Sequence, residues 1–333
     1  MLWMMESPSE EDIDQFLISL YRNLLRRDPD RDGFANYRGF LNTAGFPGFS
    51  RVVRSFVESP EFKGLYNVTV SGNALEGFGG FDFSSLGMEE LNALFEKTAT
   101  YWRGLASSPE EIYWSVLTDD RYRGVLDDNV IKGFLETGRD DVSRIKSICE
   151  EIDFAFDDCR EYLEYGCGVG RLVVNLPSSI QKINCVDFSS AHLCEAEVNL
   201  RRLGNSSRYE MHEVESLSDL AQLPSSQDII HSFLVLQHNT PPVMEKTVAS
   251  LLELLSSGGI AILHIPIAKV HYSFDVKAYL SNDNSGQSME MHILPKSNLF
   301  RVARESDCAI VYSYCAGGCG GDIYSEILVF QKA

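Results

Sequence analysis

Apolar residues follow two different spacings along this chain. In the first part they recur every three to four positions, as at Ile13, Leu17 and Leu24, which is the spacing of an amphipathic helix. A run rich in glycine and phenylalanine at residues 72–87 is typical of a linker. The helical spacing predicts further helices at about residues 34–45, 52–57, 88–105, 109–117, 128–137 and 140–152.

Short apolar runs replace the helical pattern after about residue 158. The runs at residues 162–165, 183–186, 229–236 and 260–265 have the length of strands, and helical stretches separate them. Strands that alternate with helices predict βαβ units, and therefore an α/β fold with a parallel sheet.

The charge of the chain argues against several kinds of partner. The 333 residues carry a formal net charge of -19, from 29 basic and 48 acidic side chains. The acidic excess is concentrated between residues 64 and 158, where 19 acidic side chains accompany 8 basic ones. Nonspecific binding to nucleic acid or to an anionic membrane needs a clustered positive field, so we expect neither partner.

The sequence predicts neither export nor membrane insertion. No apolar run reaches the roughly 18 residues of a membrane span. The segment Met1–Glu11 carries acids where a signal peptide needs a basic flank and an apolar run. All eight cysteines lie between Cys149 and Cys319, and we expect them to be reduced thiols. A cytoplasmic protein without a transmembrane segment is therefore predicted.

An Asp-rich turn raises the question of a metal site. Asp28, Asp30, Asp32 and Gly33 match the opening of a calcium-binding loop. That loop needs a glutamate at its twelfth position, which is Gly39 here, so we favour a helix end with side-chain capping. No histidine or cysteine spacing supports a zinc site, and we predict no metal.

The most informative motif is a glycine loop after the first strand. Gly166, Gly168 and Gly170 follow Glu164, and a helix is expected to begin near Arg171. Glycine is needed where the backbone turns sharply and a ligand comes within contact distance. A dinucleotide site would show the order G-x-G-x-x-G, so the spacing disfavours a nicotinamide-dependent oxidoreductase. The carboxylate beside the loop suits a cationic ligand better than a pyrophosphate.

A second acid lies at the end of the second strand. Asp187 stands where a carboxylate can accept hydrogen bonds from both hydroxyls of a ribose. Together, Glu164, the glycine loop and Asp187 resemble the cofactor motifs of class I S-adenosylmethionine-dependent methyltransferases. The resemblance implies a Rossmann-like, mostly parallel seven-stranded sheet with a helical cap, and S-adenosyl-L-methionine as the cofactor. Glu164 and the loop glycines would cradle its methionine part, Asp187 would bind the ribose and Phe188 would flank the adenine.

Five further residues are expected near the cofactor: the resemblance implies three of them, and the two after the fourth strand follow from their place at the carboxyl end of a strand. They are Val214 and Glu215 after the third strand, Ser232 and Phe233 after the fourth, and Thr137 in a lid. The alternative to a cofactor site is a structural turn followed by a solvated acid.

Three residues are candidates for catalysis. Residues 235–239 and 288–295 resemble one branch of these methyltransferases, whose members often accompany glycan-building enzymes. His238 is the first candidate for a general base, because a neutral imidazole can take the proton of an acceptor hydroxyl. The alternative is that His238 orders its loop. Glu290 and His292 are further candidates, because their segment often walls the acceptor pocket in this family.

The N-terminal part resembles a small all-helical bacterial domain of unassigned function. The resemblance covers about residues 12–64, and the domain is found beside surface-protein and glycan-assembly modules, which implies an accessory or docking role. We therefore expect a helical accessory domain at residues 1–70, a helical connector and cofactor cap at residues 71–157, and the methyltransferase domain at residues 158–333.

The expected function is O-methylation of a sugar or glycan hydroxyl in polysaccharide or natural-product biosynthesis. The acceptor would be a small molecule or a glycan, and the N-terminal domain would bind a glycan-assembly protein. The alternative is a non-catalytic scaffold with a vestigial cofactor site, although the intact glycine loop argues against it.

Overall fold

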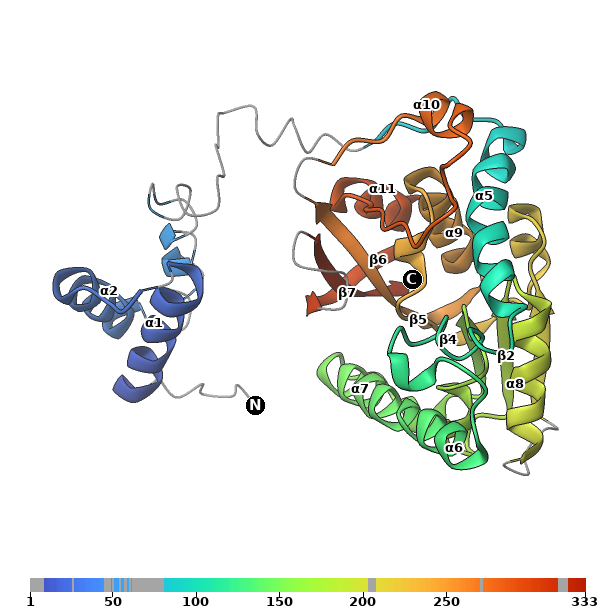
Figure 1. The fold of residues 1–333 in the computed structure, drawn as a ribbon. Coiled ribbons are helices and arrows are strands. Elements are labelled where there is room, and N and C mark those ends of the chain that lie inside the picture. Colours follow the sequence, from blue (N-terminus) through green and yellow to red (C-terminus); the bar gives the residue numbers. More distant parts are fainter. Residues whose placement is uncertain are drawn as a thin grey trace. The chain divides into compact units, whose positions relative to one another are not determined.

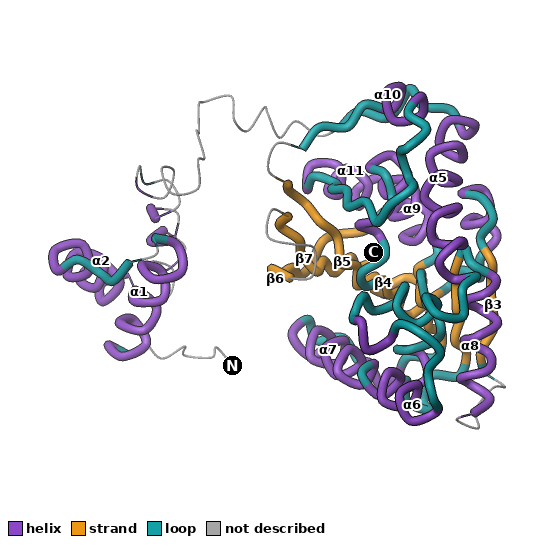
Figure 2. Tube along the Cα trace, viewed as in Figure 1, coloured by secondary structure: helices purple, strands orange, loops and turns teal. Residues whose placement is uncertain are grey.

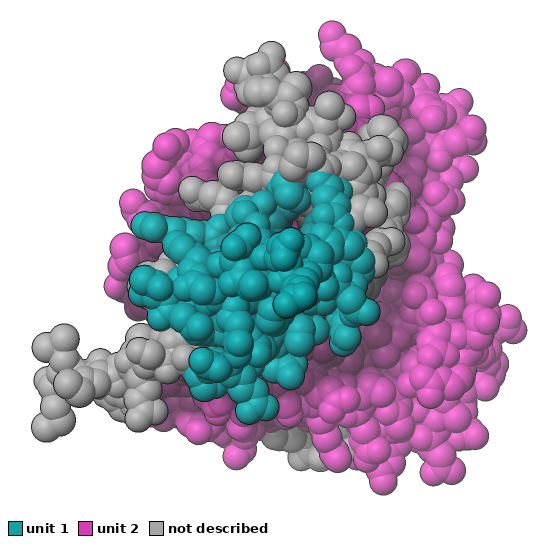
Figure 3. Space-filling view, turned by 90° about the vertical axis from the view of Figure 1, so that its left-hand side faces the viewer, with its two compact units in different colours: residues 1–79 teal, residues 80–333 magenta. Residues whose placement is uncertain are grey.

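The chain forms two compact units, residues 1–79 and 80–333, which Figure 3 shows in two colours. The described part of the predicted connector, residues 81–157, belongs to the second unit, and residues 71–80 lie outside the described residues. The computed structural model describes residues 9–25, 27–44, 81–202, 208–269, 272–316 and 323–333, and several positions between 49 and 61.

Two helices, α1 (Glu10–Leu24) and α2 (Arg31–Ala44), form most of the described part of the first unit (Figure 1). Ser9 caps α1: its hydroxyl accepts a hydrogen bond from Asp12 N at 3.1 Å, and the Asp12 carboxylate accepts one from Ser9 N, also at 3.1 Å. In the predicted apolar stripe Ile13 and Leu17 are buried and Leu24 is partly buried, and both predicted helices are confirmed. The core of the unit consists of Ile13, Leu17, Tyr21, Leu25, Leu41, Val52 and Phe56.

Asp30 caps α2 at the end of the Asp-rich turn. Its carboxylate accepts hydrogen bonds from Gly33 N at 2.7 Å and from the Arg27 guanidinium at 3.2 Å. A side chain at position 33 would collide with the Tyr21 hydroxyl and the Asp30 carboxylate, which would have to move to make room for it. The capping prediction for the turn is confirmed.

A seven-stranded sheet forms the centre of the second unit, with the strand order β3-β2-β1-β4-β5-β7-β6. Strands β1 to β5 run parallel to one another, β7 runs antiparallel to β5, and β6 runs antiparallel to β7. The predicted Rossmann-like fold is confirmed, and the order of the sheet reverses between β1 and β4. The strands are β1 (Glu161–Tyr165), β2 (Lys182–Asp187), β3 (Tyr209–Glu213), β4 (Gln227–Ser232), β5 (Leu255–Lys269), β6 (Cys308–Ala316) and β7 (Ile323–Lys332).

Helices cover both faces of the sheet (Figures 1 and 2). On one face, α5, α9 and α11 pack around strand residues such as Leu163 and Leu263; on the other, α7 and α8 pack around Tyr162 and Ile262. Because successive strand residues point to opposite faces, both faces must be apolar, as the uninterrupted runs of the sequence indicate. In the described chain, no helix is long and apolar enough to cross a bilayer. The helices are α5 (Met88–Ala106), α6 (Asp128–Glu136), α7 (Gly138–Glu151), α8 (Ser190–Arg202), α9 (Pro241–Glu253), α10 (Val276–Ser281) and α11 (Lys296–Glu305).

The helix predicted at residues 109–117 is wrong, because this segment forms hydrogen-bonded turns. Tertiary contacts explain the difference. The Tyr113 hydroxyl donates hydrogen bonds to Glu195 at 2.5 Å and to Asn199 at 3.2 Å, and its ring packs edge-on against Phe134. These contacts with α6 and α8 outweigh a weak local preference for helix.

Two predicted boundaries around the glycine loop are also wrong. The helix expected near Arg171 is only a 3-10 turn, Val173–Asn175, because the Asn175 amide donates to the Arg171 carbonyl at 2.9 Å. Strand β4 ends at Ser232, because Leu234 has φ +58°, a left-handed conformation that a strand cannot contain.

Candidate functional site

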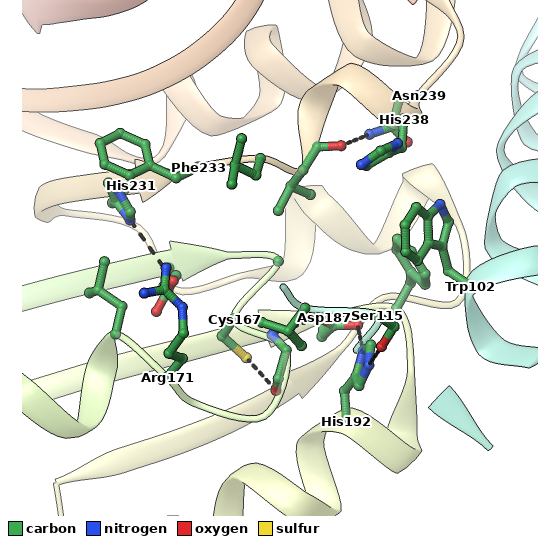
Figure 4. A pocket seen from close by; sticks show the side chains of 18 of the residues that line it. Trp102, Ser115, Cys167, Arg171, Asp187, His192, His231, Phe233, His238 and Asn239 are labelled. Carbon is green, nitrogen blue, oxygen red and sulfur yellow. Dashed lines mark hydrogen bonds and ion pairs between the residues drawn. The ribbon is translucent and has the colours of Figure 1, made fainter. Parts of the chain in front are cut away.

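A pocket opens at the carboxyl ends of β1, β2 and β4, where the order of the sheet reverses (Figure 4). It holds about 770 Å³ of space, its open mouth included. Residues that no sequence motif assigned to a site complete its wall, among them Trp102, Ser115, Arg171, His192 and His231. Seven of the expected site residues line it: Glu164, Gly166, Gly168, Asp187, Phe188, Phe233 and His238.

Two glycines of the loop cannot carry a side chain. Gly166 and Gly168 have φ +78° and +52°, in the left-handed region. A side chain at Gly166 would collide with Val235, and one at Gly168 would come within 2.7 Å of Val116. Gly170 lies behind the loop against α8 and does not line the pocket. The floor of the pocket is therefore bare main chain that a ligand can approach closely.

At one end of the pocket, each oxygen of the Asp187 carboxylate accepts a main-chain hydrogen bond. Its Oδ2 accepts from Gly168 N at 3.0 Å and its Oδ1 accepts from Ser189 N at 2.9 Å. His192 Nδ1 lies 3.4 Å from Oδ1, and His192 Nε2 lies 2.9 Å from the Ser115 hydroxyl. These contacts tie the glycine loop, α8 and the segment after α5 to one carboxylate.

At the other end, buried polar atoms lack partners. Glu164 is 7% exposed, and its Oε2 makes no hydrogen bond; neither does any ring nitrogen of His231, whose Nδ1 is 4.0 Å from Glu164 Oε1. Burial raises the pKa of Glu164 to about 8, although Arg171 opposes the shift. Burial lowers the pKa of His231 to about 3. Both groups are therefore mainly uncharged at pH 7 in the protein alone.

His238 lies in a short turn after β4 and presents one free lone pair. Its Nδ1 is 3.0 Å from the carbonyl oxygen of Glu290. A carbonyl can only accept, so Nδ1 carries the hydrogen and Nε2 keeps its lone pair. Burial lowers the pKa of His238 to about 4, so the ring is neutral at pH 7. Its ring packs against Trp102 with 4.5 Å between the centroids.

The side chains of Glu290 and His292 lie outside this pocket, in a cluster of their own. The Glu290 carboxylate accepts hydrogen bonds from the Tyr279 hydroxyl at 2.7 Å, from a main-chain N–H at 2.9 Å and from His292 Nε2 at 3.2 Å. His292 Nδ1 is 2.7 Å from the Tyr272 hydroxyl. Burial alone would raise the pKa of Glu290, but these hydrogen bonds outweigh it and lower the pKa to about 2. The cluster fixes the segment whose carbonyl binds His238.

Four further residues of the predicted site do not line the pocket. Val214 is buried in the core, and Glu215 is exposed on the surface. The hydroxyl of Ser232 is buried and donates to a β1 carbonyl at 2.9 Å. The hydroxyl of Thr137 donates to a carbonyl of α6 at 2.6 Å and accepts from Arg171 at 3.3 Å, so it reaches the pocket only through that arginine.

Two segments of the chain match known families. Residues 163–259 match the family described as "Methyltransferase domain", and residues 7–66 match a domain of unknown function, DUF4214. The second match agrees with the helical domain of unassigned function expected at residues 12–64. The first covers both the glycine loop and Asp187. This segment is therefore similar to methyltransferase domains, and the match supports S-adenosylmethionine as the cofactor.

Individual proteins are similar to this chain at 30% sequence identity or less. A ubiquinone biosynthesis O-methyltransferase of Nitrosospira multiformis is 30% identical over 100 residues, which cover 30% of this chain and 40% of that protein. The chain thus spans less than half the length of this curated relative.

Among solved structures, magnesium protoporphyrin IX methyltransferase (ChlM) from Synechocystis PCC 6803 with bound SAH is 16% identical, with coverage of 71% and 100% of the two chains and a TM-score of 0.49. N-methyltransferase NodS from Bradyrhizobium japonicum WM9 is 12% identical, with coverage of 71% and 98% and a TM-score of 0.46. Likeness at this level leaves the methyl acceptor open.

The residues of the pocket fit the cofactor. S-adenosylmethionine carries an ammonium and a sulfonium group, and Glu164 Oε2 is a buried acceptor without a partner in the protein. A ribose has two hydroxyls to donate, and each oxygen of Asp187 can accept more than one hydrogen bond. Gly166 and Gly168 line the pocket with main chain, because Val235 and Val116 already occupy the space that side chains at these positions would need.

Proposed function

We propose that this protein transfers a methyl group from S-adenosylmethionine to a hydroxyl oxygen of a small molecule or a glycan. One observation carries the proposal: a buried, unpartnered carboxyl group, Glu164, and a hydrogen-bonded carboxylate, Asp187, stand at opposite ends of one glycine-floored pocket. Transfer to oxygen, rather than to nitrogen or carbon, is supported by the relative named as an O-methyltransferase.

The residues of the pocket hold the donor in a fixed place. In the proposal, Glu164 binds the ammonium group, Asp187 binds the ribose hydroxyls and Phe188 packs against the adenine. The bound cofactor supplies an electrophilic methyl group on a positively charged sulfur. Holding donor and acceptor in line lowers the barrier, because the reaction then needs no further loss of translational freedom.

His238 is the proposed general base. It is neutral at pH 7, and the bond of Nδ1 to the Glu290 carbonyl leaves Nε2 to take the proton of the acceptor hydroxyl. In this proposal Glu290 and His292 act through His238: their cluster holds the carbonyl that fixes its ring. The second candidate role for His238 is to order its loop, and the same hydrogen bond to the Glu290 carbonyl would do this.

A variant of His238 separates the two roles. A general base contributes about 10²- to 10⁴-fold to a rate, so His238→Gln should lower kcat by about a hundredfold or more while the Kd for S-adenosylmethionine changes less than about threefold. A radiolabelled-methyl assay and calorimetry would measure the two quantities. Equal losses in kcat and in affinity would instead assign His238 the loop-ordering role.

The acceptor class is the finer part of the proposal. We favour a sugar or glycan hydroxyl in polysaccharide or natural-product biosynthesis. The support is that members of both resembled families are found beside glycan-building proteins. The N-terminal unit would then bind a glycan-assembly protein. A non-catalytic scaffold is the second candidate function, favoured by the match of residues 7–66 to a domain without assigned chemistry.

Two measurements test the proposed function. Calorimetry should detect saturable binding of S-adenosylmethionine by the full chain, and a labelled-methyl screen of nucleotide sugars, oligosaccharides and small hydroxyl compounds should find an acceptor. Absence of cofactor binding would contradict methyl transfer and leave the scaffold. Binding of the cofactor and transfer only to amines would contradict the choice of oxygen.

A further inference from the structure

A second hollow adjoins the cofactor pocket. It holds about 860 Å³ of space, its open mouth included, and it shares Arg171, Phe233 and Leu234 with the first pocket. The rest of its wall comes from α7 and from strands β5, β6 and β7. A molecule in this hollow would touch the same three side chains as a cofactor in the first pocket. The hollow is therefore where an acceptor can meet the donor.

The charged side chains that line the described part of this hollow do not balance. Asp141 Oδ1 lies 3.2 Å from the Arg144 guanidinium, and Asp141 Oδ2 lies 2.5 Å from that of Arg171. One carboxylate thus serves two cations. His264, also in the wall, is neutral at pH 7, because burial lowers its pKa to about 4. One positive charge is left for a ligand to neutralise.

The exposed fractions of the two arginine side chains indicate which guanidinium can pair with a ligand. The Arg171 and Asp141 side chains are 12% and 14% exposed, whereas Arg144 is 50% exposed. The buried pair is held in place by its surroundings, but the Arg144 guanidinium reaches the open part of the hollow. It also lies over the ring of Phe233, 5.7 Å from the centroid. Arg144 is therefore an anion-binding group next to an aromatic surface.

The rest of the wall is apolar or aromatic. Tyr314 on β6 and Ile327 on β7 line it together with Phe233 and Leu234. Leu234 has φ +58° and is 36% exposed, so a bulky apolar side chain is held in a left-handed conformation at the border of the two pockets. Strain of this kind persists where the surrounding structure imposes it, commonly at ligand sites. The hollow thus offers an apolar surface for a ring beside one cationic group.

We propose that this hollow binds the methyl acceptor, and that the acceptor is a hydroxyl-bearing carboxylic acid. This inference rests on the proposed function. The acceptor carboxylate would pair with the Arg144 guanidinium, and its ring, from an acidic sugar or an aromatic hydroxy acid, would pack against Phe233 and Tyr314. One unbalanced positive charge matches one carboxylate, whereas a phosphate monoester would bring nearly two negative charges.

The step that follows is balanced. The acceptor oxygen forms a bond to the methyl carbon, while the carbon–sulfur bond breaks and its electron pair remains on sulfur as a neutral thioether. The acceptor hydroxyl would extend into the first pocket, where His238, the proposed base, takes its proton. No oxidant, reductant or metal is needed, and the acceptor carboxylate stays unchanged.

Matched pairs of acceptors test the chemistry. Labelled-methyl transfer by the full chain should be at least about tenfold faster with 4-hydroxybenzoate than with 4-hydroxybenzyl alcohol, or with a glucuronic acid oligosaccharide than with its neutral glucose counterpart. Whichever pair shows the preference identifies the source of the carboxylate. Equal rates within both pairs, or faster transfer to a sugar phosphate, would overturn the inference.

Variants of α7 test the site independently of turnover. By calorimetry, Arg144→Gln should weaken binding of the preferred acid about tenfold or more and leave the Kd for S-adenosylmethionine unchanged, and Arg144→Lys should restore part of the loss. Lys146→Gln is the matched control: it removes a cation two residues away that pairs with Asp157 at 4.0 Å, and it should change neither affinity.

The outcomes separate this inference from the function on which it rests. Failure of the wild type to bind S-adenosylmethionine would remove the proposed function. Normal cofactor binding with acid binding that Arg144→Gln leaves unchanged would remove only the acceptor site.

Discussion

The carboxyl groups at the two ends of the cofactor pocket differ in their hydrogen bonding. Both groups are buried, with Glu164 7% exposed and Asp187 5% exposed. Asp187 accepts two main-chain hydrogen bonds, from Gly168 and Ser189. Glu164 has an oxygen without any partner, and the neighbouring His231 has two such nitrogens.

At the Asp187 end the fold itself supplies the hydrogen bonds, whereas at the Glu164 end a ligand has to supply them. A buried polar atom without a hydrogen bond costs about 1–3 kcal/mol. Three buried atoms of Glu164 and His231 carry this cost, whereas both oxygens of Asp187 have hydrogen-bond partners. We infer that the ribose end is built before the cofactor arrives, and that the methionine end is completed by it. Titratable groups in a cleft whose pKa is shifted by burial are commonly functional. The pKa of Glu164 is raised in this way.

The largest expected effect follows from removing Asp187, which both builds the loop and contacts the ribose in the proposal. Asp187→Ala leaves the N–H groups of Gly168 and Ser189 without their acceptor. We expect the free energy of unfolding to fall by about 2 kcal/mol or more, and the affinity for S-adenosylmethionine to fall at least about a hundredfold. Chemical denaturation and calorimetry measure the two losses.

The matched control for Asp187 lies on the same sheet but away from the pocket. Asp228 Oδ2 also accepts two main-chain hydrogen bonds, from Arg160 N at 2.7 Å and Glu161 N at 3.0 Å. Asp228→Ala should therefore lower stability to a similar degree and leave cofactor affinity nearly intact. If both variants lost affinity in proportion to stability, Asp187 would have no role beyond the fold.

A smaller effect with a distinctive pH dependence is expected for Glu164. With a pKa of about 8 in the free protein, the carboxyl group must lose its proton before it can bind an ammonium group. The affinity of the wild type for S-adenosylmethionine should therefore rise up to about tenfold per pH unit between pH 6 and 8, and then level off. Glu164→Gln should bind about tenfold or more weakly at pH 8, with a Kd that stays flat over this range. A Kd of the wild type independent of pH would contradict the assignment.

The same variant should gain stability relative to the wild type as the pH rises. A glutamate in an unfolded chain has a pKa of about 4.5, so between about pH 4.5 and 8 the folded chain holds a proton at Glu164 that the unfolded chain has released. The free energy of unfolding of the wild type then falls with rising pH. Glu164→Gln removes this loss, so its stability relative to the wild type should increase from about pH 4.5 to pH 8. Denaturation midpoints at several pH values measure the difference.

Local patterns in the sequence predicted the part of the site that lies close together along the chain. Glu164 and the loop glycines stand within seven residues, and the apolar strand before them sets their place at the sheet edge. Asp187 could be predicted because it ends the next strand. The sheet could also be predicted, because strands that are buried on both faces appear in the sequence as continuous apolar runs.

Contacts between distant segments could not be predicted in the same way. Ser115 meets His192 from 77 residues away, and Arg171 meets Asp141 from 30 residues away. No periodicity or motif records such a pair. The helix expected at residues 109–117 is wrong for the same reason, since its tyrosine is held by a helix far along the chain.

The smallest expected effect tests whether the Asp187 end is truly prebuilt. The Ser115 hydroxyl joins the segment after α5 to His192, but Asp187 keeps its two main-chain hydrogen bonds without it. Ser115→Ala should therefore weaken S-adenosylmethionine binding only about two- to fivefold, mainly through faster dissociation, as stopped-flow measurements can resolve. Ser107→Ala is the control, because that hydroxyl donates only to the Arg103 carbonyl on the exposed end of α5. A loss for Ser115→Ala as large as that for Asp187→Ala would mean that the cap, and not the glycine loop, holds this end together, and the contrast between the two ends would disappear.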